Sequence, residues 1–597
     1  MLSKKLMSGL SGLVISAIFF TVGPVQSASG ATLDNDDGFY EEDRPDDGYQ
    51  GVLFRERPPW ESTFSWLQVG GKPCEDITGN CLQYLNPDGT LPPFEFNSLL
   101  GPCVDPSETD CIEQVQASVD SGQVEVATFD RFFPNKGAND FQGNSRMRLP
   151  NGGTAGVWRF PSIRHGGGAD FFLRVGVTGK VNTAKNPTVA VVDSQFSEIH
   201  ATLFAVQEIA GNCTEDGIKM FCGPRKPTFS EVQNGTPLGG VLISPRSGVG
   251  WTGPTDCVMT SRNSRCLQRR ALPENFFFRI VLRLSQSPSG WLHGRLSEPE
   301  MGLSEINEEA GYRLTLGGGS ISVPVIKSGG SFAELPISIQ DAYRNNGGFR
   351  GSPRFTRDFG CTKCADPNTR NMTSTPLAYG KDSFDELALW IPHVGDRASA
   401  NLSTWSIRTI PPSQISSASS WCLKVDGTLK GLVATNATVY SAGPPTFDQN
   451  EKTLNYQVSA PHYTSGMQKF LGTYDLVMRS DTARCIYNLQ SVPINATISL
   501  LDEDGETTVA TTIMSERDGW LRLAAYGFGF SAPTIKIKLQ AQPPAQIGAE
   551  IPVASNGSTK KRFTIVCVKK KNVRILTGIK PTCPKGFTRK LNSHTQP

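Results

Sequence analysis

Histidine, the side chain that most often transfers protons or binds metals near neutral pH, occurs only six times in the 597 residues. None begins an HExxH metal motif, and no two lie four residues apart as a helical metal pair would require. His165, in "RHGGGAD", is the most notable, because three glycines follow it and would let a ligand approach the backbone. A histidine packed at a strand end beside a glycine bend is the commoner arrangement, so His165 is kept as a speculative ligand site.

Established catalytic motifs are missing from the sequence. No GxSxG elbow or phosphate-binding loop occurs, and we therefore assign no catalytic residue, metal ligand or cofactor. Cys361 and Cys364 have redox spacing, but no strand–helix–strand pattern surrounds them, which favours a structural bridge.

Glycan chemistry would leave little trace in a sequence. A carboxylate pair for hydrolysis comes from distant strands, so its members have no fixed spacing to read. Tryptophans could line a sugar platform, although at strand positions they more often belong to the core. The candidates are Trp158, Trp291, Trp390, Trp405 and Trp520.

The C-terminal segment "CVKKKNVRILTGIKPTCPKGF" (567–587) places basic residues between two cysteines. No acid follows Glu550, and residues 551–597 contain eleven Lys or Arg. A bridge between Cys567 and Cys583 would close a β-hairpin whose cationic face attracts anionic wall polymers, with salt screening over about 8–10 Å. The equal alternative is a solvated face that keeps the hairpin soluble. The candidate polymer-binding residues are Lys569, Lys570, Lys571, Arg574, Lys580 and Lys585.

Nucleic-acid binding by this tail is not expected, because only Phe563 and Phe587 could stack on bases. The opposite end of the chain is acidic: "DNDDGFYEEDRPDD" (34–47) carries eight acids against one Arg. The segment near the N-terminus is therefore strongly negative and the C-terminal segment strongly positive.

Fourteen cysteines, an even number, follow an N-terminal segment typical of a secretory signal peptide: "MLSKKLMSGLSGLVISAIFFTVGPVQSASGA" has two early lysines, a broken apolar run and small residues suited to cleavage. In that context the cysteines predict disulfides, and their order suggests neighbouring pairs. The pairs are Cys74 with Cys81, Cys103 with Cys111, Cys213 with Cys222, Cys257 with Cys266, Cys361 with Cys364, Cys422 with Cys485, and Cys567 with Cys583.

Period-two alternation dominates the rest of the chain and predicts half-buried strands. Examples are "ADFFLRVGVTGK" from 169, "FRIVLRLS" from 278 and "PTIKIKLQ" from 533, and Asp504-Gly505 has the signature of a tight hairpin turn. Only 111–119 and 338–346 are short helix candidates. We expect a mainly β fold of tandem, immunoglobulin-like β-sandwich domains with disulfide-stapled loops and a small C-terminal hairpin.

Composition divides the chain into ranges. Cys422 and Cys485 are 63 residues apart, as in the inter-sheet bridge of immunoglobulin-like domains, although the expected core Trp after the first cysteine is missing. The predicted ranges are a signal peptide (1–29), an acidic linker (30–60), one or more β-rich domains (61–328), a β-rich connecting region (329–415), a β-sandwich (416–545), and a linker with the basic disulfide hairpin (546–597).

Several phrases, among them "WRFPSIRHGGGADFFLRVGV", "GTYDLVMRSDTARCIYNL" and "DGWLRLAAYGFGFSAPTIKIKL", resemble a group of secreted actinobacterial proteins of unknown function. The resemblance covers most of residues 100–545. The tail resembles a short two-cysteine module at the ends of other exported actinobacterial proteins, which implies a role in export, folding or retention at the envelope.

Together these features predict an exported, envelope-associated binding or structural protein that carries no cofactor and has no membrane-spanning segment in its mature chain. Its partners would be anionic wall or surface polymers. A secreted glycan-active hydrolase with an unrecognised carboxylate pair is the alternative.

Overall fold

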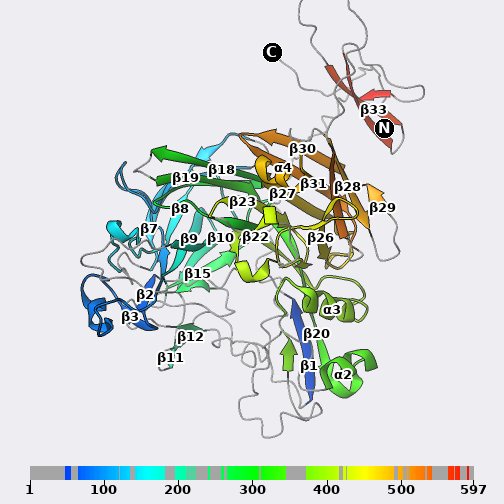
Figure 1. The fold of residues 1–597 in the computed structure, drawn as a ribbon. Coiled ribbons are helices and arrows are strands. Elements are labelled where there is room, and N and C mark those ends of the chain that lie inside the picture. The colour runs from blue at the N-terminus through cyan, green and yellow to red at the C-terminus, as the bar shows by residue number, and fades with distance from the viewer. Residues whose placement is uncertain are drawn as a thin grey trace, which may run out of the picture. The chain divides into compact units, whose positions relative to one another are not determined.

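Alternating apolar residues form strands throughout the computed structural model, which is mainly β as predicted (Figure 1). The structure describes residues 48–54, 65–119, 122–134, 141–181, 195–210, 214–216, 219–221, 240–242, 257–260, 265–307, 311–344, 372–374, 376–415, 421–424, 427–489, 495–501, 507–509, 511–530, 534–540, 563–569, 572–578 and 588–590. No helix in these ranges has the length and apolar character needed to cross a membrane. The chain divides into two units, residues 1–541 and 542–597.

A sheet of 18 strands is the centre of the first unit. Pairing along its main path joins β3 (Lys72–Cys74), β2 (Trp66–Val69), β4 (Phe94–Leu99), β9 (Asp170–Val181), β10 (Gln195–Ala210), β22 (Ala400–Ile410), β17 (Gly290–Arg295), β23 (Leu429–Thr435), β27 (Gly472–Arg479), β31 (Trp520–Phe528) and β30 (Thr511–Arg517). Branches add β7 (Thr128–Phe132), β8 (Gly156–Arg159), β14 (Cys257–Thr260), β15 (Arg265–Arg270), β20 (Ile321–Ser331), β1 (Tyr49–Phe54) and β21 (Met372–Ser374).

A five-stranded sheet covers one face of the central sheet. Its order is β18 (Ser297–Asn307), β19 (Gly311–Gly319), β16 (Phe276–Leu284), β5 (Cys111–Val119) and β6 (Glu125–Val126). The predicted inward faces of β9 and β16 are confirmed, because alternate residues from Phe171 to Val177 and from Phe278 to Leu284 share one buried core. Figure 1 shows β18 and β19 as a layer over β8–β10.

A second core lies on the opposite face of the central sheet. Along β17, Trp291 belongs to this second core and Leu292 to the first; along β27, Leu476 and Val477 divide in the same way. The covering sheet runs β24 (Val439–Tyr440), β26 (Thr453–Ser459), β32 (Thr534–Gln540), β28 (Asn495–Leu501) and β29 (Thr507–Val509), with β25 (Thr446–Asp448) on β26. The central sheet is therefore the shared middle layer of two sandwiches.

The helix predicted at 111–119 is wrong, because these residues form β5. A register shift opposite Val281 and Leu282 inserts an extra residue, Glu113, between the paired positions Ile112 and Gln114. This β-bulge lets Ile112 and Val115, three residues apart, reach the same core. Their helical spacing in the sequence is the consequence of the bulge.

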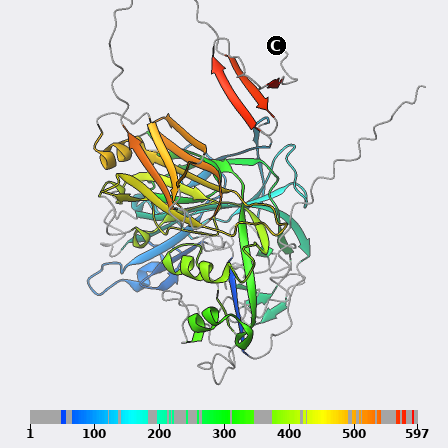
Figure 2. The same cartoon turned by 90° about the vertical axis from the view of Figure 1, so that its right-hand side faces the viewer.

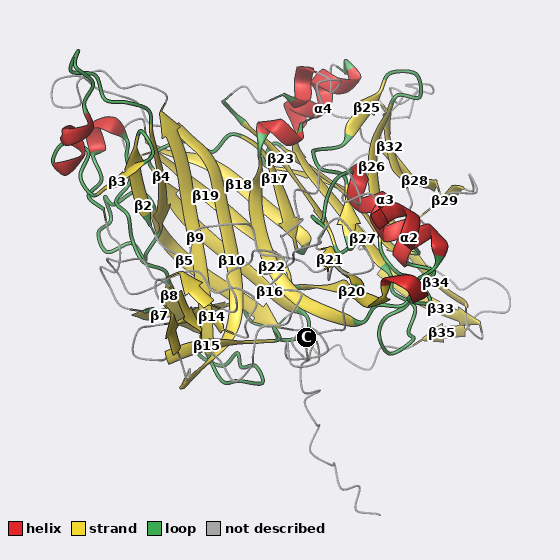
Figure 3. Cartoon of the chain, turned by 90° about the horizontal axis from the view of Figure 1, so that it is seen from below, coloured by secondary structure: helices red, strands yellow, loops and turns green. Residues whose placement is uncertain are grey.

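Two helices cover β1 and β20. The predicted helix at 338–346 is confirmed as α2 (Ile337–Arg344), which packs with α3 (Lys381–Trp390) around a third core (Figure 3). In Figure 2 the blue β1 lies along the green β20. Residues 49–54, which lie within the predicted acidic linker (30–60), are thus a buried strand, because the charged run stops at Asp47 and apolar residues follow.

Three predicted disulfides are present: Cys74–Cys81, Cys103–Cys111 and Cys422–Cys485. Cys266 is also disulfide-bonded. The third bridge joins a 3-10 turn, η6 (Trp421–Leu423), to α4 (Ser480–Tyr487), so the expected correspondence with an inter-sheet immunoglobulin bridge is wrong. The remaining predicted cysteines lie outside the described residues or in strands whose side chains are not described: Cys213, Cys222, Cys257, Cys361, Cys364, Cys567 and Cys583.

Two smaller sheets complete the description. In the first unit, β11 (Thr214–Asp216), β12 (Lys219–Phe221) and β13 (Gly240–Leu242) pair in that order. The second unit contains the predicted C-terminal hairpin, β33 (Phe563–Lys569) with β34 (Asn572–Gly578), and a third strand, β35 (Thr588–Lys590), on the other edge of β33. The predicted turn at Asp504-Gly505 lies outside the described residues, but its flanking strands β28 and β29 pair antiparallel.

Candidate functional site

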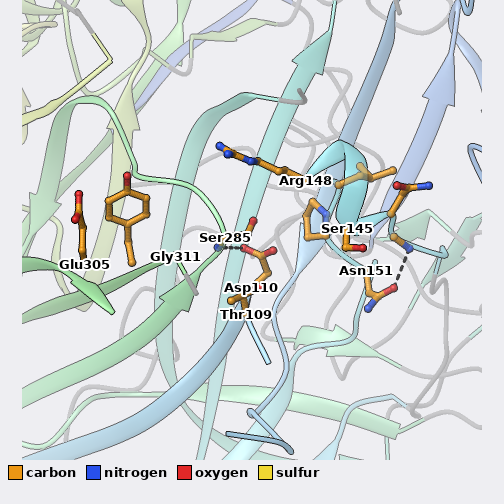
Figure 4. Close-up of a pocket in the computed structure, with 13 residues that line it drawn as sticks. Thr109, Asp110, Ser145, Arg148, Asn151, Ser285, Glu305 and Gly311 are labelled. Atoms are coloured by element: carbon orange, nitrogen blue, oxygen red, sulfur yellow. Dashed lines mark hydrogen bonds between the residues drawn. The ribbon is translucent and has the colours of Figure 1, made fainter. Parts of the chain in front are cut away.

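A polar pocket of about 600 Å³ opens at one end of the five-stranded sheet (Figure 4). The start of β5, the ends of β16 and β18 and the start of β19 meet there, because neighbouring strands are antiparallel. A loop from residues 141–151 completes the wall. The lining residues are Thr109, Asp110, Gly143, Asn144, Ser145, Arg148, Leu149, Pro150, Asn151, Ser285, Glu305, Gly311 and Tyr312.

Asp110 carries the most perturbed carboxyl group of the pocket. It has a left-handed backbone (φ 57°) directly before Cys111, whose bridge to Cys103 fixes the strand start. The backbone N–H of Ser285 donates to Asp110 Oδ1 at 2.9 Å. Surrounding protein raises the pKa of this carboxyl to about 6 by desolvation, although the residue keeps some exposed surface in the pocket. The group therefore exchanges a proton near neutral pH.

The 141–151 loop is held by its own hydrogen bonds. The Asn144 and Leu149 backbones exchange bonds of 2.8 and 3.0 Å, and the N–H of Gly143 donates to Asn151 Oδ1 at 2.8 Å. Met147 and Leu149 are buried in the first core. These contacts fix the loop between the core and the pocket.

Arg148 places a cation at the pocket. It is an exposed, non-glycine residue with a left-handed backbone (φ 51°), an uncommon conformation that often accompanies functional positions. Gln286 Nε2 donates to the Arg148 carbonyl at 3.0 Å and ties the loop to the segment after β16. Backbone geometry thus directs a charged side chain away from the core.

Glu305 and Tyr312 form the far side of the pocket, and they pair across β18 and β19. Gly311 turns the chain there with φ 83°, and a Cβ atom at this position would lie 2.1 Å from the Leu284 carbonyl oxygen. Only glycine satisfies this approach. Figure 4 shows Glu305 on one side of Asp110, with Ser145 and Asn151 on the other.

The strand order keeps the backbones of the two acidic residues of the pocket, Asp110 and Glu305, well apart. The strand order β18–β19–β16–β5 separates Glu305 from the start of β5 by three strand spacings, about 14 Å in total. Glycosidase pairs lie about 5–9.5 Å apart. The geometry is suited to holding a polar ligand along the pocket.

His165, the speculative ligand site, does not line a pocket itself, but Gly167 and Gly168 after it line a second hollow. Its Nε2–H donates to the Asp170 carbonyl at 2.9 Å, and its Nδ1 accepts the N–H of Gly167 at 3.1 Å. The ring edge packs on Phe171, and burial lowers the pKa of the imidazole. Both ring nitrogens thus serve to hold the glycine bend.

The hollow beside His165 is lined by ion pairs that neutralise one another. Arg131 Nη2 lies 2.8 Å from Asp170 and 2.7 Å from Glu208, and Arg159 contacts both Asp130 and Asp170 at 2.7 Å. Arg265 pairs with Glu208. Three acids and three arginines form ion pairs with one another here, which indicates a structural network.

The other chemically notable residues are structural. His200 and His293 are buried, and His462 Nδ1 lies 2.5 Å from Asp396 Oδ2. All five tryptophans considered for a sugar platform are buried, which confirms the core interpretation. Across the described part of the chain, no group of three His, Cys, Asp or Glu is arranged to hold a metal ion.

The side chains of the candidate basic residues of the tail lie outside the part of the chain that the structure describes. Lys569 ends β33 and Arg574 lies in β34, but their side chains are not described. Lys570, Lys571, Lys580 and Lys585 lie outside the described residues.

Sequence reasoning missed the polar pocket, since its residues come from five separate segments. The nearest signal was the bridge between Cys103 and Cys111, which anchors Asp110. Comparison with models of known families, with curated proteins and with solved structures gave no match.

Proposed function

We propose that the protein is exported, remains at the cell envelope and binds a saccharide in the pocket around Asp110. The disulfides support export, because such bridges form and persist in oxidising compartments. The predicted signal peptide agrees with this.

The observation that carries the proposal is the polar lining of the pocket. Hydroxyl, amide, carboxyl, guanidinium and phenol groups converge there from β5, β16, β18, β19 and the 141–151 loop. Ligand sites for apolar molecules are lined mostly by hydrophobic and aromatic side chains. A hydroxyl-rich ligand is the better chemical complement, and the wide spacing of Asp110 and Glu305 favours binding over the hydrolase alternative.

Calorimetry with oligosaccharides released from the producer's envelope tests this proposal. We expect Arg148→Gly to weaken binding about 10- to 100-fold, the effect of losing a charge-assisted hydrogen bond. Glycine accepts the left-handed backbone, so the variant removes the side chain without adding strain. Lys452→Gly is the matched control, since Lys452 is also an exposed cation at φ 56°. Equal binding by both variants would contradict the proposed site.

We also propose that the basic tail retains the protein on anionic wall polymers. The eleven Lys or Arg of residues 551–597, with no acid among them, support this electrostatic role. We expect a salt wash to release the full chain from the wall fraction, and a chain ending at Ala554 to appear mainly in the medium. If both chains distribute in the same way between the wall fraction and the medium, the proposed retention by the tail is contradicted.

A further inference from the structure

We infer that the pocket selects a saccharide carrying an oxyanion, either a carboxylate or a phosphate, and holds it most tightly when Asp110 is protonated. This inference rests on the proposed saccharide binding and specifies the ligand class.

The side-chain amides of the pocket leave donors for a ligand. Asn151 Oδ1 accepts the N–H of Gly143 at 2.8 Å, and Asn144 Oδ1 accepts the N–H of Met147 at 3.2 Å. Each amide oxygen is therefore turned toward the protein, and each NH2 group remains the part that can meet a ligand. The amides on this wall act as hydrogen-bond donors.

Backbone acceptors of the same wall are also in use. The Arg148 carbonyl accepts from Gln286 Nε2 at 3.0 Å, and the Leu149 carbonyl accepts from the N–H of Asn144 at 2.8 Å. The Asn151 carbonyl accepts from the Ser98 hydroxyl. With these acceptors occupied, a ligand rich in acceptors fits this wall better than one rich in donors.

Hydroxyl groups add to the donor side. Ser145 and Thr109 line the pocket and supply hydroxyl groups, whereas the buried Ser285 hydroxyl interacts with the Asp110 carboxyl. Arg148 supplies positive charge. Oxyanions accept several hydrogen bonds at once and are the natural partners of such a donor set.

Asp110 makes binding depend on pH. Its Oδ1 already accepts the Ser285 N–H, so the protonated carboxyl can donate from its other oxygen to the ligand. The ionised carboxyl repels an anion instead. The other charged or titratable lining groups are Arg148, Glu305 and Tyr312, and Glu305 lies on the far side of Asp110 from the donor wall (Figure 4).

The test uses a galacturonate tetramer, a galactose tetramer as its neutral counterpart and a galactose 6-phosphate tetramer, each titrated into the full chain at pH 5 and pH 8. We expect an acidic tetramer to bind at least tenfold more tightly than galactose tetramer at pH 5, and to lose about tenfold in affinity at pH 8. The acidic tetramer that binds identifies the oxyanion as carboxylate or phosphate.

Asp110→Asn keeps a donor but cannot ionise, so the ratio of its dissociation constants at the two pH values should fall to within twofold. Asp518→Asn is the matched control: Asp518 is exposed, has φ 53°, and should leave the wild-type ratio unchanged. If Asp110→Asn does not fold, Arg148→Gly replaces it and should reduce the preference for acidic over neutral tetramer.

The outcomes separate the two proposals. Equal affinity for acidic and neutral tetramers would overturn the oxyanion inference and leave saccharide binding intact. If Asp110→Asn keeps the wild-type ratio of the dissociation constants at pH 8 and pH 5, the role of Asp110 is overturned. Binding of none of the tetramers, nor of envelope oligosaccharides, would overturn the proposed function itself.

Discussion

Asp110 combines an unfavourable environment with a position in the pocket. Its pKa is raised from 3.8 to about 6, so its neutral form adds stability below pH 3.8, and that contribution is lost as the pH rises through 6. At pH 8 the Asp110 carboxyl is ionised in its buried position, which lowers the free energy of unfolding. Such a cost at a ligand site is the usual trade between stability and function.

We therefore expect Asp110→Asn to increase the free energy of unfolding at pH 8 by about 1–2 kcal/mol, a value reduced from the full pKa difference because the residue is partly exposed. Urea denaturation at pH 8 and pH 4 measures this, and the gain should vanish at pH 4. A loss of stability at pH 8 would show that the carboxylate is needed by the fold.

Two buried histidines give the opposite dependence on pH. Burial lowers the pKa of His200 and of His293 well below 6.5, with nearby arginines adding to the effect. Both are neutral in the folded state, so stability is complete above pH 6.5 and falls as the pH drops below it. Below pH 6.5, each of these histidines that stays neutral in the folded state lowers the free energy of unfolding by up to about 1.4 kcal/mol per pH unit.

His293→Phe should reduce this loss of stability between pH 6.5 and pH 5, because phenylalanine takes up no proton in the unfolded state. The substitution also keeps the stacking on Tyr440, whose ring centroid lies 4.0 Å away. Unfolding free energies at pH 7, 6 and 5 provide the measurement. An unchanged slope would place the acid sensitivity elsewhere.

At the scale of single elements, alternation predicted the strands well. β9, β16 and β32 direct their apolar residues inward as expected. β5 was mistaken for a helix because its bulge changes the spacing of Ile112 and Val115, and a single sequence gives no sign of a bulge in a pairing that it does not reveal. Asp110 and Glu305 escaped prediction for the related reason that strand pairing brings them to one end of the sheet, and Arg148 escaped because it comes from a separate loop.

The bridge between Cys103 and Cys111 is predicted to position Asp110. Replacing both cysteines by serine should cost about 2–3 kcal/mol of stability, as expected for an eight-residue loop, and should also weaken ligand binding. Thermal unfolding and calorimetry test the two effects.

The same replacement at Cys422 and Cys485 is the control. Its loop of 63 residues predicts a larger loss, about 4 kcal/mol, but the bridge lies between η6 and α4 and should leave ligand binding intact. Weakened binding in this control alone would contradict the positioning role.

At the scale of the whole chain, strands from the predicted ranges 61–328, 329–415 and 416–545 pair within one central sheet. Composition could not show this, because strands far apart in the sequence pair without leaving a local signal. The first core draws Trp405, Leu432 and Val477 from beyond residue 328.

Residues 61–328 should therefore not fold alone, whereas a chain of residues 48–541 should unfold cooperatively. Circular dichroism during heating of the two fragments provides the test. A cooperative transition in the shorter fragment would show that the first core is complete without the later strands.

Strand β17 packs against a core on each of its two faces, and this limits the substitutions that it can accept during evolution. All six of its residues are buried, with one core on each side, so no position of this strand faces water. Random mutagenesis with selection for folded protein should accept almost no changes from Gly290 to Arg295. Neutral drift should instead accumulate at edge strands such as β3, and the oldest traces of shared ancestry would survive in the middle layer.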